Sequence, residues 1–393
     1  MEDDVALKLV HTADWHLGKR FRSFEKEQAR TLTRERLAVV ERTLLLTKQH
    51  QANALLCAGD LFDSPQPEEE WWRGLLQHLA SHSRPECPVF LLPGNHDPLK
   101  PGSVYGSEHP FRRALPKWVH VVDRNDFSYD LSKDAVLYAV PCLSQAGQDD
   151  PTKSLPRRVE GDRRLRIGLV HGPTVAIEGT QPNFLVSKTA AHELGFDYLA
   201  LGDTHSFTEV ESGTPVPVVY PGTPEVTNFP NWDGNLISEK SKGEVAVVFF
   251  RRHPQPPLVR RETVGRFRWV AARCQSLESM RALKARSGLE ETVLKLELDL
   301  AVTLKEEAEL EQILRELEGG DAMAGRAAAV QLDRKRVELT TGDLDELLPR
   351  LPSVLRATVK RLREQAANDT EEGVLATRAL RHLYQVVRKE VAQ

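Results

Sequence analysis

The chain has 393 residues, a formal net charge of −4 at pH 7, 40% hydrophobic residues and 28% charged residues. This composition excludes wholesale disorder, and the length predicts two or three domains rather than one. The net charge excludes a simple basic clamp for nucleic acid, so any nucleic-acid binding must use a local patch or bound metals. The longest apolar run near a strand end, residues 245–250, is too short to span a bilayer.

The four cysteines, at positions 57, 87, 142 and 274, are scattered, and no two of them form a CxxC pair. The sequence therefore predicts neither a zinc ribbon nor a disulfide framework, which fits a reducing compartment. The first residues are acidic and lack an apolar stretch, so no secretory signal is visible. We therefore expect a cytoplasmic protein.

The first 250 residues alternate apolar strands with helical patterns, which predicts an α/β core. Strands are expected at residues 7–10, 54–58, 89–92, 165–170, 198–201, 216–220 and 244–250. Helices are expected at about residues 25–50, with Leu37, Val40, Leu44 and Leu45 on one side, and around residues 71–79. The early strand–helix–strand units predict a partly parallel sheet covered by helices, and the later strands predict antiparallel additions.

The pattern changes around residues 251–263, where a strand exit and a proline-rich linker are expected. A smaller β-α-β-α-β unit is expected next, with strands at 267–272, 292–298 and 328–332 and helices at 276–287 and 304–318. From Leu344 onward we expect two amphipathic helices, with apolar stripes at Leu351, Leu355, Val359 and Leu362 and at Leu375, Ala379, Leu383 and Val387. The predicted domains are therefore residues 1–262, 263–341 and 342–393.

Polar side chains follow the last apolar residue of five predicted strands. In chain order they are Asp14 and His16, Asp60 and Asp63, Asn95, His96 and Asp97, His171, and Asp203 and His205. A single aspartate at such a position is usually a helix cap or a turn former. Five such sites in order favour a site at the carboxyl edge of the sheet, and carboxylate, imidazole and amide groups together suit manganese, iron or zinc.

The order of the motifs DxH, GDxFD, GNHD, HG and GxxH resembles that of the calcineurin-like metallophosphoesterases. Within them, HTADWHLG at residues 11–18, GDLFD at 59–63 and YPGTPE at 220–225 resemble the SbcD and Mre11 DNA-repair nucleases. The resemblance covers residues 10 to about 225, and the smaller α/β unit resembles that family's capping domain. It implies an α/β fold: a calcineurin-like metallophosphoesterase sandwich with a small α/β capping domain and a C-terminal helical tail.

Carried over by position, the resemblance implies a site for two divalent metal ions, most simply Mn²⁺, with Fe²⁺ or Zn²⁺ as alternatives. The implied ligands are Asp14, His16 and His205 for one ion, Asn95, His171 and Asp203 for the other, and Asp60 as the bridge. His96 would donate a proton to the leaving oxygen or stabilise the pentacovalent phosphorus, and Asp97 would orient His96.

Two positions depart from the family pattern. The last motif is usually GHxH, so Asp203 stands where a histidine is expected. The alternatives are that it acts as an oxygen ligand or that it only caps a turn. Asp63 stands where a histidine is frequent in the nucleases, and it could at most orient a neighbour.

The resemblance implies a metal-dependent nuclease that processes DNA ends in double-strand-break repair, with an SbcC/Rad50-like ATPase bound to the C-terminal helices. The sequence contains no GxxxxGK[ST] motif, which assigns ATP hydrolysis to that partner. The resemblance also allows a homodimer, and it places the protein at the nucleoid, away from membranes. Two alternatives stay open: a phosphodiesterase or phosphatase acting on small molecules or phosphoproteins, and an inactive scaffold subunit.

Other histidines and aromatic residues are expected to have structural roles. His78, His82 and His192 lie on helical patterns and are expected at the surface or in packing contacts. His11 is expected to point away from the site, because side chains alternate along a strand. Trp71 and Trp72 are expected to pack their helix rather than to stack on bases.

Overall fold

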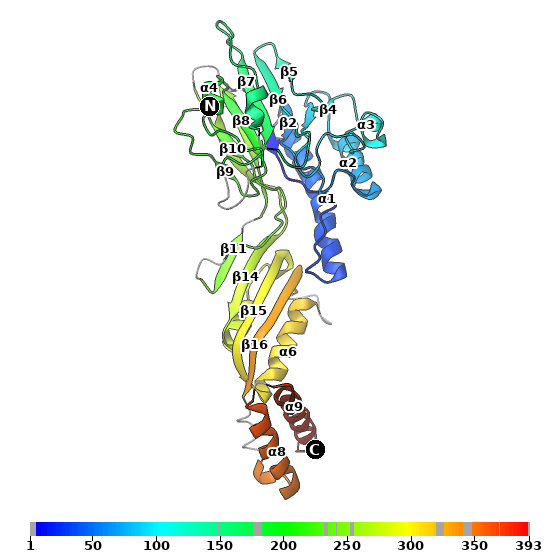
Figure 1. Cartoon of the computed structure of the whole chain (residues 1–393), viewed down its shortest axis with the longest axis vertical. Helices are drawn as coiled ribbons and strands as arrows, with labels where there is room; N and C mark the ends of the chain where they lie inside the picture. Colours follow the sequence, from blue (N-terminus) through cyan, green and yellow to red (C-terminus); the bar gives the residue numbers. More distant parts are fainter. Residues whose placement is uncertain are drawn as a thin grey trace. The chain divides into compact units, whose positions relative to one another are not determined.

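A computed structural model describes residues 5–147, 149–175, 183–231, 235–240, 242–251, 255–319, 326–340, 348–368 and 370–391. The chain forms two compact units (Figure 1). Unit 1 comprises Met1–Asn228 and Lys240–Arg268, and unit 2 comprises Phe229–Glu239 and Trp269–Gln393. Unit 1 extends past residue 262 because strand β13 (Leu258–Thr263) pairs with strand β12 (Glu244–Arg251).

Unit 1 contains two six-stranded sheets, with strand orders β13-β12-β1-β2-β3-β4 and β5-β6-β7-β8-β10-β9. The strands of the first sheet are β1 (Val5–Thr12), β2 (Ala54–Cys57), β3 (Val89–Leu91) and β4 (Val119–Val121), together with β12 and β13. Those of the second are β5 (Phe127–Ser132), β6 (Ala135–Ala139), β7 (Leu165–His171), β8 (Tyr198–Gly202), β9 (Thr208–Glu209) and β10 (Val218–Tyr220). Strands β1 to β4 are parallel, and β12 joins them antiparallel, as predicted.

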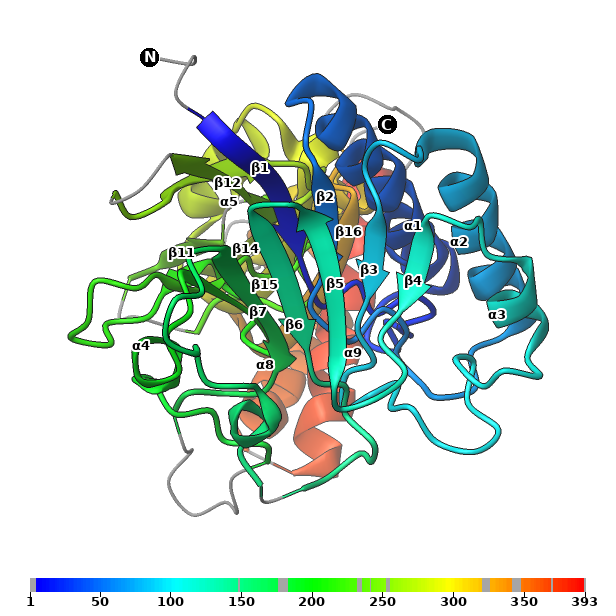
Figure 2. The same ribbon diagram turned by 90° about the horizontal axis from the view of Figure 1, so that it is seen from above.

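Side chains alternate along each strand, so each sheet has two faces, and one face of each sheet packs against the other sheet. Apolar residues from both sheets, among them Leu56 and Leu169, form one buried cluster between them. The other face of the first sheet packs against α1 (Lys26–Gln49), α2 (Glu69–His82) and α3 (Pro110–Ala114) (Figure 2). The outer face of the second sheet packs against the segment around α4 (Ala190–Glu193). This layered α/β sandwich confirms the predicted fold class.

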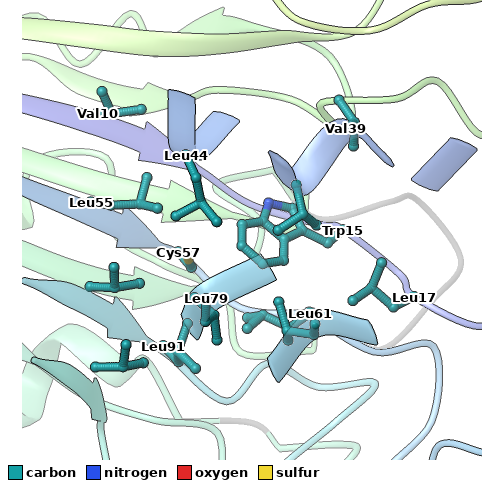
Figure 3. Packing of buried hydrophobic residues seen from close by; sticks show 14 of the residues in the cluster. Val10, Trp15, Leu17, Val39, Leu44, Leu55, Cys57, Leu61, Leu79 and Leu91 are labelled. Atoms are coloured by element: carbon teal, nitrogen blue, oxygen red, sulfur yellow. The ribbon is translucent and has the colours of Figure 1, made fainter. Parts of the chain in front are cut away.

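The helix side of the first sheet also anchors the loops that follow its strands. Leu44 of α1 and Leu79 of α2 lie over Leu55 and Leu91 of the sheet (Figure 3). Trp15, Leu17 and Leu61, from the loops after β1 and β2, are buried in the same cluster. These loops are therefore held by packing. The prediction for Leu45 is wrong, because its side chain is 45% exposed.

Unit 2 contains a four-stranded sheet of order β11-β14-β15-β16. Its elements are β11 (Ile237–Lys240), β14 (Arg268–Cys274), α5 (Leu277–Lys284), β15 (Thr292–Thr303), α6 (Leu304–Glu318) and β16 (Ala329–Thr340). Strands β15 and β16 are parallel and are joined through α6, as in a β-α-β crossover. A capping box between Thr303 and Glu306 begins α6, and Gly319, in a left-handed conformation, ends it. The described residues also form short 3₁₀ helices: η1 (Pro151–Ser154) in unit 1, and η2 (Leu289–Glu291) and η3 (Leu348–Arg350) in unit 2.

The last two helices, α8 (Ser353–Ala366) and α9 (Glu371–Val391), pack against each other. Leu351, Val359 and Leu380 are buried between them, and Leu355, Leu362 and Leu383 pack against these residues. The stripe on α8 is as predicted. On α9, Leu383 packs against this cluster as predicted, but the prediction for Leu375 is wrong, because Leu375 is 67% exposed whereas Ala376 and Leu380 are buried.

The start of α9 is capped by Thr370, whose Oγ1 accepts a hydrogen bond from the Gly373 amide at 3.1 Å. Leu344 and the side chain of Val387 lie outside the described residues. In the part of the chain that the structure describes, no helix has both the length and the apolar composition needed to cross a membrane.

Candidate metal centre

The nine predicted site residues come from loops or strand ends at the carboxyl edge of five strands: β1, β2 and β3 of the first sheet and β7 and β8 of the second. The loops after β1 and β2 pair through their backbones, since the Asp14 amide donates to Gly59 O and the His16 amide donates to Asp60 O. The loop after β3 joins them, because the His96 amide donates to Asp60 Oδ1 at 2.9 Å. The fold thus brings the three loops of the first sheet into one place.

Backbone strain is concentrated at this place. Among the described residues, the non-glycine residues with positive φ are Asp14, His16, Gln51, Asp60, Phe184 and Asp203. Four of these six are predicted site residues. Such conformations are unfavourable for residues with a Cβ, and they persist where the surrounding structure fixes them, often at functional sites.

Two glycines permit the close approach of the site side chains to the backbone. A Cβ on Gly94 would lie 2.2 Å from Asp60 Oδ1, and one on Gly59 would lie 2.2 Å from His171 Nδ1. Gly59 also has a φ of +93°, which favours glycine by itself. The glycines of the GD and GN dipeptides are therefore required by the packing of the site.

The candidate ligand atoms form two overlapping clusters. The ligand atoms of Asp14, His16 and His205 all lie within 4.8 Å of one another, and so do those of Asp14, Asp60 and His171. His16 Nε2 lies 3.2 Å from His205 Nε2. Atoms that each lie about 2.0–2.2 Å from a shared ion are separated by about this much.

Asp60 and Asn95 extend these clusters. Asp60 Oδ2 lies 3.7 Å from His16 Nε2 and 3.6 Å from His171 Nε2, so it stands between the two groups. Asn95 Oδ1 lies 2.8 Å from His171 Nε2. This geometry fits the predicted bridging position of Asp60 and the predicted pairing of Asn95 with His171.

The buried histidines His16 and His171 and the half-buried His205 turn the same ring atom toward the clusters. His16 Nδ1 lies 3.1 Å from Asp63 Oδ1, and His171 Nδ1 lies 2.7 Å from the Ala58 carbonyl oxygen. Since neither partner can donate, the proton of each ring belongs on Nδ1, which leaves the Nε2 lone pair for a metal. His205 Nδ1 lies 3.1 Å from Thr227 Oγ1, which gives its Nε2 the same orientation.

The electrostatics of the site also suit cations. Burial raises the pKa of Asp14 well above its usual value, and the nearby carboxylates of Asp60 and Asp203 raise it further. Burial alone would lower the pKa of His171, but the carboxylates of Asp60, Asp14 and Asp203 outweigh it and raise the pKa to about 9. Burial and neighbouring cationic groups lower the pKa of His205 to about 2. Crowded buried carboxylates beside imidazoles form a donor set that fits divalent ions, and an ion bound at His171 would take the place of the proton that these carboxylates favour.

Asp203 lies at the edge of this arrangement. Its amide donates to the Asp14 carboxylate at 3.1 and 3.2 Å, and burial raises the pKa of its own carboxyl group. Among the described residues, Asp203 belongs to neither three-residue cluster at the 4.8 Å limit. The ligand role of Asp203 therefore stays a prediction.

His96 is exposed, and its ring lies 4.8 Å from that of His16, centroid to centroid. The side chain of Asp97 accepts hydrogen bonds from the Phe62 amide, the Gly94 amide and the Tyr105 hydroxyl. None of these three bonds involves the His96 ring, so they do not provide the direct orienting bond that was predicted from Asp97 to His96. Asp97 instead fixes the backbone of the loop that carries His96 through the Gly94 amide, and its second oxygen ties this loop to the Phe62 amide and to Tyr105.

A buried arginine that sequence reasoning missed holds the first ligand loop. Arg36 of α1 donates from Nε to Trp15 O at 2.7 Å and from its terminal nitrogens to Asp14 O at 2.9 Å and Glu225 O at 2.7 Å. Burial lowers its pKa to about 10, so it remains charged at neutral pH. An arginine within an apolar helix face is the signal that could have identified it.

Residues 7–207 match the family model of the calcineurin-like phosphoesterases, and the chain belongs to this family. Among curated proteins it is 38% identical to the SbcD subunit of the nuclease SbcCD of Rhodobacter capsulatus, over 47% of this chain and 44% of that protein. It is 25% identical to the DNA double-strand break repair protein Mre11 of Methanopyrus kandleri over 62% of this chain and 54% of that protein. It is also 23% identical to the uncharacterized metallophosphoesterase YhaO of Bacillus subtilis, over 63% and 60% of the two chains.

These matches confirm the resemblance to the SbcD and Mre11 type. In each of the three, the matched stretch covers less than two thirds of the relative.

Proposed function

We propose that this chain is a metal-dependent nuclease that cleaves phosphodiester bonds at DNA ends and acts with an SbcC/Rad50-like ATPase. Its similarity to an SbcD protein and to an Mre11 protein supports this assignment. The converging imidazole and carboxylate atoms support the chemistry, since phosphoester hydrolysis commonly uses two divalent ions.

The observation that carries the choice of DNA over a small phosphoester is a basic hollow that starts at the first ligand loop. A cavity of about 830 Å³ begins at Gly18, and its lining carries more basic than acidic residues: Arg20, Arg22, Lys26, Arg30 and Arg34 against Glu68 and Glu70. A neighbouring cavity of about 450 Å³ shares Gly18 and Arg22 with it and reaches Asp63, the partner of His16. A row of basic side chains beside the catalytic edge suits a polyanion that is longer than one nucleotide.

Trp71 lines both cavities and contacts the ligand loop. A Cβ added at Gly18 would lie 2.9 Å from the indole Cδ1. Trp72, in contrast, is buried in the helix packing, as predicted for both residues. Trp71 therefore gives the hollow an aromatic wall next to its basic side chains.

Asp14, His16 and His205 would hold one ion, Asn95, His171 and Asp203 the second, and Asp60 would contact both. When bound, the ions, which we expect to be Mn²⁺, polarise the phosphate and activate water for attack on phosphorus. Asp63 and the Ala58 carbonyl keep the rings of His16 and His171 in the tautomer with a free Nε2. Arg36 holds the backbone of the loop that carries Asp14.

His96 is assigned the proton transfer to the leaving oxygen. It is exposed at the rim next to His16, where a substrate could reach it. His16, Asp63 and His96 also lie within 4.8 Å of one another, so a ligand role for His96 has to be excluded by experiment. General acid catalysis is worth about 10²–10⁴-fold in rate.

A substrate panel tests the proposal. With Mn²⁺ present, we expect cleavage of labelled blunt duplex and hairpin DNA and of bis-p-nitrophenyl phosphate, with little cleavage of p-nitrophenyl phosphate. Preference for the monoester, with no cleavage of DNA, would favour the phosphatase alternative. His96→Ala should keep the metal content of the wild type and lose about 10²–10⁴-fold in cleavage rate. Loss of metal in that variant would make His96 a ligand.

The domain roles are part of the same proposal. The small α/β sheet of unit 2, β14 to β16, would serve as the capping domain, and α8 and α9 would bind the ATPase. Val354, Val374 and Leu375 are exposed on these two helices, which supports a binding surface there.

A further inference from the structure

A second group of metal-ligating side chains lies on the two helices that cover the first sheet, separate from the ligand loops. Glu41 comes from α1, and His78 and His82 come from α2. Their ligand atoms all lie within 4.8 Å of one another. His78 Nδ1 lies 3.8 Å from Glu41 Oε2, and His82 Nε2 lies 3.4 Å from Glu41 Oε1.

The spacing of the histidines places them on one face of the helix. Residues four apart on an α-helix project from successive turns, and this is the spacing at which two histidines on one helix can bind one zinc ion. The two rings are stacked, with centroids 6.0 Å apart and an interplanar angle of 28°. Both rings lie close to the carboxylate of Glu41.

Close packing of the two helices fixes the third ligand. A Cβ on Gly74 of α2 would lie 2.4 Å from Leu37 Cδ2 of α1, so the helices approach closely there. Glu41 lies four residues after Leu37 and His78 lies four residues after Gly74, so the next turn of each helix brings these two side chains together. Both helices also pack on the buried cluster of the first sheet, which makes the support rigid.

The exposure of the three side chains permits an ion to enter. The exposed fractions are 21% for His78, 28% for His82 and 42% for Glu41. Burial lowers the pKa of His78, and the neighbouring His82 lowers it further, although Glu41 opposes both effects.

We propose that Glu41, His78 and His82 form a zinc site that joins α1 to α2, with water in the remaining position. Two imidazole nitrogens and one carboxylate oxygen are a ligand set that zinc uses in tetrahedral sites. The site is independent of the proposed nuclease centre, since it shares no residue with it. Its expected effect is to stabilise the helix pair, because an ion bound only in the folded state raises stability.

The test is a zinc count on the full chain after chelator treatment and dialysis against a small molar excess of Zn²⁺. We expect the wild type to bind one zinc more per chain than either His82→Ala or Glu41→Gln. His192→Ala, which removes an exposed histidine of α4 outside the cluster, should match the wild type. Because the result is a difference between variants, it holds whatever number of ions the nuclease centre takes up.

Thermal unfolding provides the second measurement. Zinc should raise the melting temperature of the wild type and of His192→Ala more than that of His82→Ala. Equal zinc counts and equal thermal shifts in all variants would overturn the proposal. If His82→Ala is already unfolded without zinc, Glu41→Gln decides by the same two measurements, since its exposed side chain can be replaced without disturbing the core.

Discussion

Single residues at the candidate metal centre combine a chemical role with a strained backbone. Asp14, His16, Asp60 and Asp203 all have positive φ, and the hydrogen bonds of the loops hold them there. The residue type of Asp203 does not decide its role, because an aspartate can either cap a turn or bind a metal ion. Its φ of +101° separates the two explanations, since glycine accepts that conformation and cannot bind an ion through a side chain.

We therefore expect Asp203→Gly to retain the fold and to lose one of the two ions per chain, with a parallel loss of cleavage. Asp203→His should recover at least part of both, because an imidazole restores a ligand at that position. Metal content measured by mass spectrometry and cleavage of bis-p-nitrophenyl phosphate provide the readouts. An unchanged metal content in Asp203→Gly would assign Asp203 to the turn alone.

Among the elements, helix α1 does more than cover the sheet. Its buried residues include Arg36, whose guanidinium is fully enclosed and donates to carbonyl groups of the first ligand loop and of Glu225. A planar guanidinium can serve several carbonyls in fixed directions, whereas a lysine presents a single ammonium point. Because α1 is packed on the sheet, Arg36 holds the loop that carries Asp14 and His16 in a fixed position.

Arg36→Met should reduce the free energy of unfolding by about 2–4 kcal/mol, because buried carbonyl oxygens would lose their donors. It should also weaken metal binding, since the ligand loop loses its support. Urea denaturation of the metal-free protein and a metal titration measure the two effects. Arg30→Met, which removes an exposed arginine from the same helix, is the matched control. Equal stability of the two variants would contradict the positioning role.

At the scale of the whole molecule, helices α8 and α9 have a small core of their own. The buried cluster between α8 and α9 draws on residues 348–383, and the cluster of the small α/β sheet draws on residues 270–337. Removal of the helices should therefore leave the apolar cluster of the small sheet intact. Leu375 is exposed on the helix pair and is available to a partner.

Truncation after residue 341 should preserve metal-dependent cleavage of bis-p-nitrophenyl phosphate and abolish co-purification with the SbcC/Rad50-like ATPase expressed from the same source. Leu375→Ser in the full chain should weaken co-purification without a change in cleavage, because the residue is exposed. Unfolding of the truncated nuclease core would show that the helices belong to that core, and the proposed partner surface would lose its support.

Local sequence patterns predicted seven strands of the core and the chemical types gathered at the carboxyl ends of five of them, whereas β4, β5, β6, β9 and β13 were not predicted. Periodicity and turn residues are local, so β2, β7 and β8 and the polar groups that follow them could be located without a structure. The ligand types were also readable, since their positions follow from strand ends. The family membership of residues 7–207 rests on the same local motifs.

Contacts between side chains of distant segments, in contrast, required the three-dimensional arrangement. Asp97 lies beside the loop of Phe62 rather than against the ring of His96, because Tyr105 and two amides occupy its carboxylate. The pairing of Glu41 with His78 and His82 depends on the approach of two helices at Gly74. The buried face of α9 was likewise set by its contact with α8. Such long-range contacts depend on packing between elements, which the local pattern of a single segment does not specify.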